Sequence, residues 1–166
     1  MKEKKLIIIS GLPASGKSTL ARSLAPERAI CTTDDMPSLY TRVEGEPPVF
    51  NGGKLNEEGV PLIVVAHQLN QQKAKKLMEN GEEVVVVPNT NTQRWEFEPY
   101  LKMAQVHGYE MERIDLFDAG LSDEDLASRN VNGVTADVIA RMREHYVHGD
   151  DWLNDDPRPP WERIVE

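Results

Sequence analysis

One local feature limits the possible folds of this chain more than any other: a complete G-x-x-x-x-G-K-[ST] phosphate-binding loop (Walker A motif) directly after an apolar run. The loop spans residues 11–19, the apolar run residues 6–9, and an amphipathic stretch follows at 19–24. This order predicts a strand, a loop and a helix, so that backbone N–H groups and the helix N-terminus face a bound anion. Because all three parts occur in order, we interpret the motif as a functional P-loop rather than a chance match.

The individual positions of the loop predict a nucleoside triphosphate, ATP, and Mg²⁺ as ligands. Side chains at Gly11 and Gly16 would obstruct the backbone where it wraps around the β-phosphate. Lys17 is expected to reach the β- and γ-phosphates, and Ser18 is expected to supply one oxygen to the metal. The predicted nucleotide-binding residues combine the loop with one arginine of a later segment: Gly11, Pro13, Ala14, Ser15, Gly16, Lys17, Ser18, Thr19 and Arg129.

The composition of the chain argues against several other classes of protein, such as nonspecific nucleic-acid-binding, disulfide-bonded, zinc-binding and membrane-spanning proteins. The chain has 166 residues and a net charge of -9, from 19 basic and 28 acidic residues. This balance argues against an extended nonspecific nucleic-acid surface, which needs clustered cations, so any nucleic acid must be held locally. The single cysteine, Cys31, excludes an intrachain disulfide, and the four histidines lack zinc-site spacing. No apolar segment is long enough for a membrane span, so we expect a cytoplasmic protein without a membrane partner.

The order of apolar runs predicts an α/β fold. β-Branched runs lie near residues 5–10, 28–33, 83–87 and 109–114, and each is separated from the next by a helical pattern. Such alternation favours a central parallel sheet of four to five strands flanked by helices.

Two of the intervening helices have clear boundaries. One is expected to open at Pro61 and to close at Asn80-Gly81, and the next to run from Glu96 to Val106 with Pro99 in its first turn. The apolar stripe predicted for the first of these consists of Leu62, Val65, Ala66, Leu69 and Leu77.

Three segments fall outside this alternation. Residues 36–60 are rich in Gly and Pro and are long for a connection, so we expect them to cover the substrate. Residues 118–147 predict a lid of two short helices, one capped by Ser122 and one by Thr135. Residues 148–166 form an acidic, Pro-containing tail after a domain of residues 1–147.

Polar residues that follow the predicted strands are candidates for an acceptor site, because ligands bind at the carboxyl ends of parallel strands. Asp34-Asp35 could deprotonate an acceptor hydroxyl or hold Mg²⁺ through water, although Asp is also common in turns and caps. The run Asn89-Thr90-Asn91 fits a site or a plain polar turn. Trp95 fits packing or the stacking of a base.

Three arginines of the predicted lid could stabilise charge on the transferred phosphoryl group: Arg129, Arg141 and Arg143. The alternative is a solvated helix face with local ion pairs, such as Arg141 with Asp137. We favour a catalytic role for Arg129.

The motifs GLPASGKST, TTDD, HQLNQ, PNTNTQRWEFEPY and LASRNVNGV, in this order, resemble the P-loop kinases grouped with polynucleotide 5′-hydroxyl kinases. This family includes the kinase domain of phage polynucleotide kinase and related eukaryotic kinase-like modules. The likeness extends over residues 5–147. It implies a P-loop NTPase fold of the kinase type with a helical lid. It also implies ATP-dependent phosphoryl transfer to the 5′-hydroxyl end of DNA or RNA. The catalytic residues implied are Lys17, Asp34 and Arg129, of which Asp34 is the general base.

The chain departs from this family on the acceptor side. Asn89 stands where the phage enzyme has a supporting aspartate, and Pro37 stands where an arginine holds the acceptor phosphate. Arg42 or Lys54 of the long loop could substitute for that arginine. The acceptor-binding candidates are Asp35, Arg42, Asn89 and Asn91.

These departures leave three functions open. The first is a polynucleotide kinase. The second is a P-loop kinase for a nucleoside, a small metabolite or a hydroxymethylated DNA base, which the acidic charge and Pro37 favour. The third is a nucleotide-binding module without transfer chemistry, against which the intact Lys17, Ser18, Asp34 and Arg129 speak.

Overall fold

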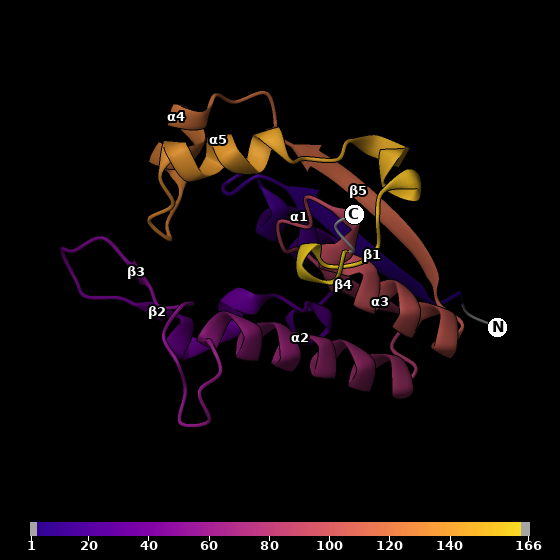
Figure 1. Cartoon of the computed structure of the whole chain (residues 1–166). Helices are drawn as coiled ribbons and strands as arrows, with labels where there is room; N and C mark the ends of the chain where they lie inside the picture. Colours follow the sequence, from indigo (N-terminus) through magenta and orange to yellow (C-terminus); the bar gives the residue numbers. More distant parts are fainter. Residues whose placement is uncertain (1–2, 164–166) are drawn as a thin grey trace.

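A parallel sheet with strand order β4-β1-β5 forms the centre of the molecule in the computed structural model, which describes residues 3–163 (Figure 1). Strand β1 (Lys5–Gly11) lies between β4 (Val84–Val87) and β5 (Glu110–Phe117) and pairs in parallel with both. Residues 164–166 of the expected tail lie outside the described part of the chain. This sheet confirms the predicted α/β class, because every connection between its strands passes through helices.

The strand expected at 28–33 is reduced to a single bridge. Ile30 pairs in parallel with Val86, and the Cys31 N–H donates to the Val86 carbonyl at 2.8 Å. A 3₁₀ turn, η1 (Glu27–Ala29), precedes this bridge, and η2 (Thr33–Asp35) follows it, so only three residues between them stay extended. The described sheet therefore has three strands, not four or five, with this segment along its β4 edge.

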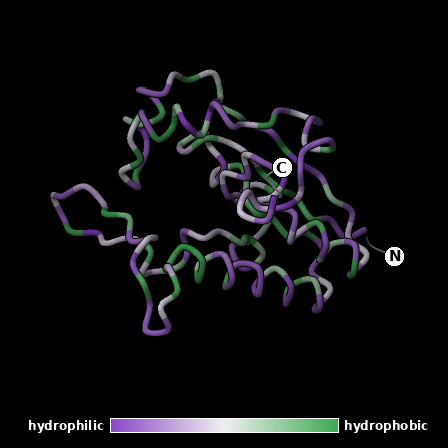
Figure 2. The backbone as a smooth tube through the Cα atoms, in the orientation of Figure 1, coloured by the Kyte–Doolittle hydropathy of each residue, from purple (hydrophilic) through white to green (hydrophobic). Residues whose placement is uncertain are grey.

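Helices cover both faces of the sheet, as the apolar character of β1 requires. Leu6 and Ile8 share a core cluster with residues of α2 (Leu62–Glu79) and α3 (Arg94–His107). Ile7 and Ile9, which point to the opposite face, pack with residues of α1 (Lys17–Leu24). All four side chains are buried, and burial of one such side chain stabilises the fold by about 1.5–3 kcal/mol. Figure 2 shows this concentration of hydrophobic residues along the central strands.

Helix α2 has the expected bounds but a different buried face. It begins after Pro61 and ends at Glu79, while its buried residues are Ala66, Asn70, Ala74 and Met78. Leu69 of the predicted stripe is 50% exposed. The Asn70 side chain explains the rotation, because its amide donates to the Cys31 carbonyl at 3.0 Å and to the Tyr100 hydroxyl at 2.8 Å. A polar residue thus lies on the inward face because two buried acceptors need it.

Helix α3 begins two residues earlier than expected. Gln93 and Glu96 form a reciprocal capping box that starts the helix at Arg94, and Gly108 ends it with φ 74°. Pro99 therefore lies inside the helix rather than in its first turn, where its missing N–H removes one backbone hydrogen bond.

The lid contains two helices, as predicted: α4 (Asp123–Arg129) and α5 (Ala136–Glu144), which lie at the top of Figure 1. The Ser122 hydroxyl caps α4 by accepting from the Asp125 N–H at 3.2 Å. The small lid core contains Leu12 of the P-loop, so the lid packs directly on the loop that it covers.

Residues 36–60 contain η3 (Pro37–Leu39) and a short antiparallel hairpin of β2 (Tyr40–Thr41) and β3 (Val49–Phe50). This hairpin extends away from the sheet in Figure 1. Because its strands have two residues each, it depends on side-chain contacts with the rest of the chain for its position.

Two tryptophans attach the described tail to α3. The tail contains the 3₁₀ turns η4 (Gly149–Asn154) and η5 (Pro160–Glu162). Trp152 packs edge-on against Phe97 with ring centroids 5.8 Å apart, and Trp161 packs against Trp95 at 5.4 Å. Within residues 3–163, no helix combines the length and apolar character needed to cross a membrane.

Candidate active site

The loop between β1 and α1 has the backbone geometry of a phosphate cradle. Ala14 (φ 66°) and Gly16 (φ 99°) both lie in the left-handed region, which turns successive N–H groups toward one side. A Cβ at Gly11 would overlap the Ser15 hydroxyl, so a side chain there would displace Ser15 from its position in the loop. The Ser15 hydroxyl itself is buried and has no hydrogen-bond partner among the described residues. An unsatisfied hydroxyl within a ring of N–H donors fits a polyphosphate ligand.

Lys17 points into this cradle. Its Nζ donates to the carbonyl oxygens of Gly11 and Leu12, both at 2.9 Å. Burial lowers the pKa of Lys17 to about 8, and the negative charge of Asp34 acts in the opposite direction. The ammonium group is thus desolvated and held by two neutral carbonyls, an environment in which a phosphate would be a stronger partner.

A cleft of about 730 Å³ opens in front of the cradle and brings the predicted residues together. The P-loop and α1 form one side, the segments after β4 and around η2 form the other, and the lid and hairpin close it. Most of the predicted site residues line this cleft: Pro13, Ala14, Gly16, Lys17, Ser18, Thr19, Asp34, Asn89, Asn91 and Arg129.

Asp34 lies across the cleft from the P-loop, in the turn η2. The turn is capped by Thr32, whose hydroxyl accepts from the Asp34 N–H at 3.3 Å. The Asp34 carboxylate accepts a hydrogen bond at Oδ1 from the Tyr40 hydroxyl at 3.2 Å, which leaves Oδ2 for another donor. Burial and the charge of Asp34 raise the pKa of Tyr40 to about 12, so Tyr40 remains a hydrogen-bond donor at neutral pH.

Asp35 is not brought to the cleft, although it follows Asp34 directly. Its carboxylate lies 3.8 Å from the Lys73 ammonium group on α2, and it does not line the cleft. Two successive residues of a tight turn point in different directions, and the η2 turn directs only the first one to the P-loop.

The two asparagines after β4 have different surroundings. Asn89 faces the cleft and accepts from the Thr33 N–H at 3.2 Å, so it holds the turn that carries Asp34. The Asn91 side chain is buried and donates to the carbonyls of Ile9 and Val87, both at 3.0 Å. Asn91 therefore links the ends of two strands, and its amide is not free for an acceptor.

The three lid arginines lie in different surroundings. Arg129, at the end of α4, is exposed and lines the cleft. Arg143 donates to Asp118 at 2.6 Å and to Asp123 at 2.9 Å, so it holds the lid together instead of facing the phosphates. These contacts keep the pKa of Arg143 above its ordinary value, through the hydrogen bond with Asp118 first.

Neither cation of the long loop replaces the arginine absent at Pro37. Arg42 donates to the Val131 carbonyl at 3.2 Å and to the Asn132 side chain, and it does not line the cleft. Arg42 thus joins the hairpin to the loop between the lid helices. Lys54 is exposed and lies outside the cleft lining.

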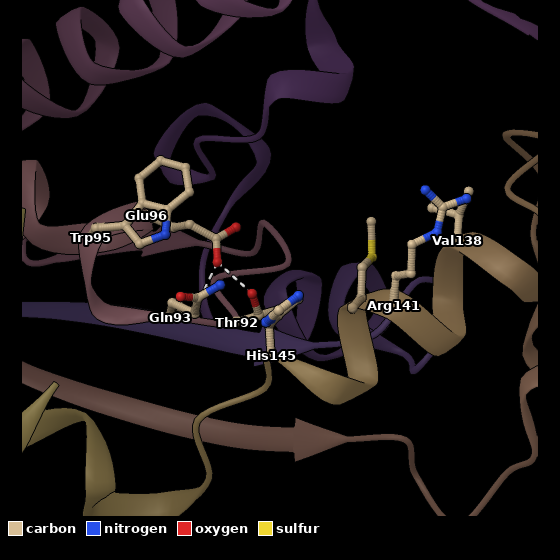
Figure 3. Close-up of a pocket in the computed structure, with 8 residues that line it drawn as sticks. Thr92, Gln93, Trp95, Glu96, Val138, Arg141 and His145 are labelled. Atoms are coloured by element: carbon tan, nitrogen blue, oxygen red, sulfur yellow. Dashed lines mark hydrogen bonds between the residues drawn. The ribbon is translucent and has the colours of Figure 1, made fainter. Parts of the chain in front are cut away.

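A side pocket of about 290 Å³ adjoins the cleft between the start of α3 and α5 (Figure 3). Glu96 lines both, and its carboxylate accepts from the Thr92 hydroxyl at 2.5 Å and from the Gln93 N–H at 2.8 Å. Burial raises the pKa of Glu96 despite these donors. Figure 3 shows the Arg141 guanidinium directed away from Glu96, and Trp95 packs on Trp161. The capping role of Glu96 accounts for its burial.

Two aromatic residues of the site, Tyr40 and Phe50, were not predicted from the sequence. Both line the cleft beside Asp34, in the segment expected to cover the substrate. The only signal in the sequence is the presence of aromatic residues in a loop that is otherwise rich in Gly, Pro and charge. For His67 of α2, the sequence allowed either a position on the helix surface or one facing the acceptor cleft. His67 lines the cleft, and burial lowers its pKa.

Comparisons with known proteins agree with this geometry. Residues 6–148 match a family model described as AAA domain. The human NEDD4-binding protein 2 is 35% identical over 149 residues, which cover 85% of this chain and 8% of that protein. The chain thus spans only a small part of the length of this relative.

Two solved structures show the same fold at low sequence identity. A candidate kinase from Chloroflexus aurantiacus j-10-fl has a TM-score of 0.53 and 18% identity, with 78% of this chain and 66% of that chain covered. A chain of the Pnkp1/Rnl/Hen1 RNA repair complex has a TM-score of 0.60 and 16% identity, with 87% and 44% covered. The fold is therefore that of a P-loop kinase-like domain.

Proposed function

We propose that this chain, which belongs to the AAA-domain family, is an ATP-dependent kinase that phosphorylates the 5′-hydroxyl end of DNA or RNA. The observation that carries the proposal is the common cleft of Lys17 and Asp34, with Arg129 of the lid at the same cleft. A phosphoryl transferase needs a cation at the donor phosphates and a group that orients and deprotonates the acceptor. We assign this work to residues 1–147, with residues 118–147 as the lid.

In this mechanism the P-loop amides and Lys17 hold the β- and γ-phosphates. Asp34 Oδ2 accepts the proton of the acceptor hydroxyl as the oxygen–phosphorus bond forms, while the bond from the γ-phosphorus to the β-phosphate oxygen breaks and ADP leaves. Tyr40 holds Oδ1 of the same carboxylate, which fixes the direction of the free oxygen. Arg129 stabilises charge on the transferred group when the lid is closed.

Mg²⁺ would neutralise charge between the β- and γ-phosphates. Ser18, at the start of α1, lines the cleft where its hydroxyl can supply one ligand. Within residues 3–163 no cluster of three or more His, Cys, Asp or Glu residues could hold a metal by itself. This fits a magnesium ion that is held largely by phosphate and water oxygens, as is usual for P-loop proteins.

A nucleic-acid acceptor is supported by the motif resemblance and by the fold shared with a protein of an RNA repair complex. The net charge of -9 is consistent with an acceptor held only at its end. One observation favours a smaller acceptor, such as a nucleoside: among the described residues that line the cleft, the lysines and arginines are Lys17, Arg22 and Arg129, all from α1 or the lid.

The test is transfer from γ-labelled ATP to a panel of acceptors: 5′-hydroxyl DNA and RNA oligonucleotides, nucleosides and hydroxymethylated duplexes. We expect label at the 5′ ends of oligonucleotides. Asp34→Asn should reduce kcat by about 10²–10⁴-fold, the usual contribution of a general base. The matched control is Asp35→Asn, which alters the same turn outside the cleft and should change kcat by less than about threefold. Label in small molecules only would exclude the polynucleotide acceptor, and equal loss in both variants would remove Asp34 as the base.

The role of Arg129 is tested by Arg129→Ala, with Arg141→Ala as the control. Both are exposed lid arginines, but only Arg129 lines the cleft. We expect the first change alone to lower kcat. A normal kcat in Arg129→Ala would contradict its role at the donor phosphates.

A further inference from the structure

The acceptor half of the cleft has aromatic rings where a cation would be expected. Its described lining, from the segments around η2, the hairpin, the start of α2 and the end of β4, contains no lysine or arginine. Burial lowers the pKa of His67 in the same wall, so this histidine is neutral at physiological pH. Arg42 lies behind this lining, over the Tyr40 ring at 5.1 Å from its centroid, and its guanidinium donates to the Val131 carbonyl and the Asn132 side chain. Among the described lining residues beside Asp34, an acceptor phosphate therefore finds no lysine or arginine.

Tyr40 and Phe50 occupy this part of the wall. Their ring centroids are 5.5 Å apart and their planes are inclined by 48°. The Tyr40 hydroxyl reaches Asp34, which places the aromatic pair next to the carboxylate that would receive the acceptor proton. Phe50 is 53% exposed, so much of its side chain is accessible from the cleft that it lines.

The tip of the Phe50 ring lies against Gly52. A Cβ on Gly52 would overlap the ring, so the ring lies directly on the glycine backbone. The Gly52 carbonyl accepts from the Ile63 N–H at 3.0 Å, which ties this contact to the start of α2. Asn51, which lies between Phe50 and Gly52, is buried, and its side chain donates to the Thr41 hydroxyl at 2.8 Å. This hydrogen bond holds β3 against β2. The tip of the ring thus contacts the glycine backbone, while about half of the Phe50 surface stays exposed.

We propose that Phe50, supported by Gly52 and Tyr40, stacks the terminal base of the acceptor, and that stacking rather than charge captures the 5′ end. This inference rests on the proposed function and names the group that site recognises. Base–aromatic stacking holds single strands without sequence preference, because every base has a π-face. An exposed ring beside the general base would bring the sugar hydroxyl of a stacked nucleotide close to Asp34.

The test compares three acceptors of one sequence: an ordinary 5′-hydroxyl oligonucleotide, one with an abasic terminal residue, and one with a neutral methylphosphonate at its first linkage. We expect loss of the base to raise KM at least about tenfold, in line with the known strength of stacking. The neutral linkage should change KM less than about threefold, because no cation lines this wall. The reverse pattern would show capture by charge and would overturn the inference.

Variants assign the effect to the ring. Phe50→Leu should abolish the discrimination against the abasic acceptor through KM, with kcat changed little, and Phe50→Tyr should restore it. Gly52→Ala should also weaken discrimination because it displaces the ring. Gly53→Ala is its matched control, since a Cβ there meets nothing within 4 Å. Equal behaviour of the two glycine variants, with thermal melts confirming that both fold, would contradict the support by Gly52.

The two proposals fail in different ways. If label enters nucleosides but no oligonucleotide, the polynucleotide acceptor is wrong, and the same variants are then tested with a nucleoside against free ribose. Equal use of nucleoside and ribose would overturn stacking, while a preference for the nucleoside that Phe50→Leu abolishes would support it.

Discussion

Lys17 gives a prediction that follows directly from the geometry of the ligand-free cradle: binding of MgATP takes up a proton at mildly alkaline pH. Its pKa is lowered to about 8 because the ammonium group is buried against two carbonyls. A bound triphosphate places negative charge on this group and raises the pKa again. Since the bound state then holds more protons than the free state, affinity must fall as pH rises through 8.

The size of the effect follows from the pKa of about 8. About three quarters of Lys17 is neutral at pH 8.5 and about one tenth at pH 7, so binding should take up about 0.75 and 0.1 proton, respectively. Between pH 7.5 and 9.5 the affinity should fall about 25-fold. Two other perturbed groups do not interfere in this window, because burial raises the pKa of Cys31 to about 11 and that of Tyr40 to about 12.

The assay is calorimetric titration of MgATP, without acceptor, in two buffers of different ionisation enthalpy. The difference in heat per mole of ligand gives the number of protons taken up. The control is Lys17→Arg, whose guanidinium stays charged throughout this range, so its proton uptake should vanish. An uptake below about 0.2 proton at pH 8.5, or an equal uptake in the arginine variant, would refute the reasoning.

Three further predictions concern the stability of the fold and the contact between hairpin and lid. Arg143→Met removes the contacts with two lid aspartates and should destabilise the protein by about 1–3 kcal/mol in urea unfolding, whereas Arg141→Met on the same helix should cost less than about 0.5 kcal/mol; equal effects would contradict the ion-pair role. Gly133→Ala and Gly45→Ala both place alanine at positive φ, but only the Cβ at position 133 would meet a hairpin carbonyl, that of Pro48. Because only this change separates the hairpin from the lid, limited proteolysis should cleave the hairpin faster in Gly133→Ala than in Gly45→Ala. Asn70→Ala leaves the Cys31 carbonyl and the Tyr100 hydroxyl without the amide that donates to them. The change should lower the free energy of unfolding by about 2–4 kcal/mol, measured by thermal denaturation, and a near-neutral result would mean that water replaces the amide.

The contact between hairpin and lid shows where prediction from sequence ends. The long loop was expected to cover the substrate, and the two lid helices were predicted. Of their two expected caps, Ser122 makes its side-chain hydrogen bond, whereas Thr135 precedes α5 without one. The connection between loop and lid through Arg42 and the Val131 carbonyl joins residues 89 positions apart, and no local pattern encodes such a contact. Arg42 was instead a candidate for the acceptor phosphate, because the sequence does not distinguish an arginine that is free to bind a ligand from one that joins two segments.

The same limit applies to adjacent residues. Asp34 and Asp35 are equivalent in local sequence, and the packing of η2 against Asn89 and Lys73 directs one to the cleft and the other to α2. Likewise, the apolar stripe of α2 was displaced because Asn70 satisfies buried groups of two other elements. Periodicity reports hydrophobicity, whereas the buried face also depends on which polar groups need a partner.

Local residue patterns were enough to predict the P-loop cradle, the helix boundaries at Pro61, Asn80-Gly81 and Ser122, and the parallel α/β class. These features depend on backbone conformation, capping and alternation over a few neighbouring residues, which local residue types specify. Tertiary contacts set which carboxylate faces the cradle, which lid arginine lines the cleft, and that aromatic rings line the acceptor wall. Those choices depend on contacts between segments distant in the chain, where the same side chain can serve either packing or binding.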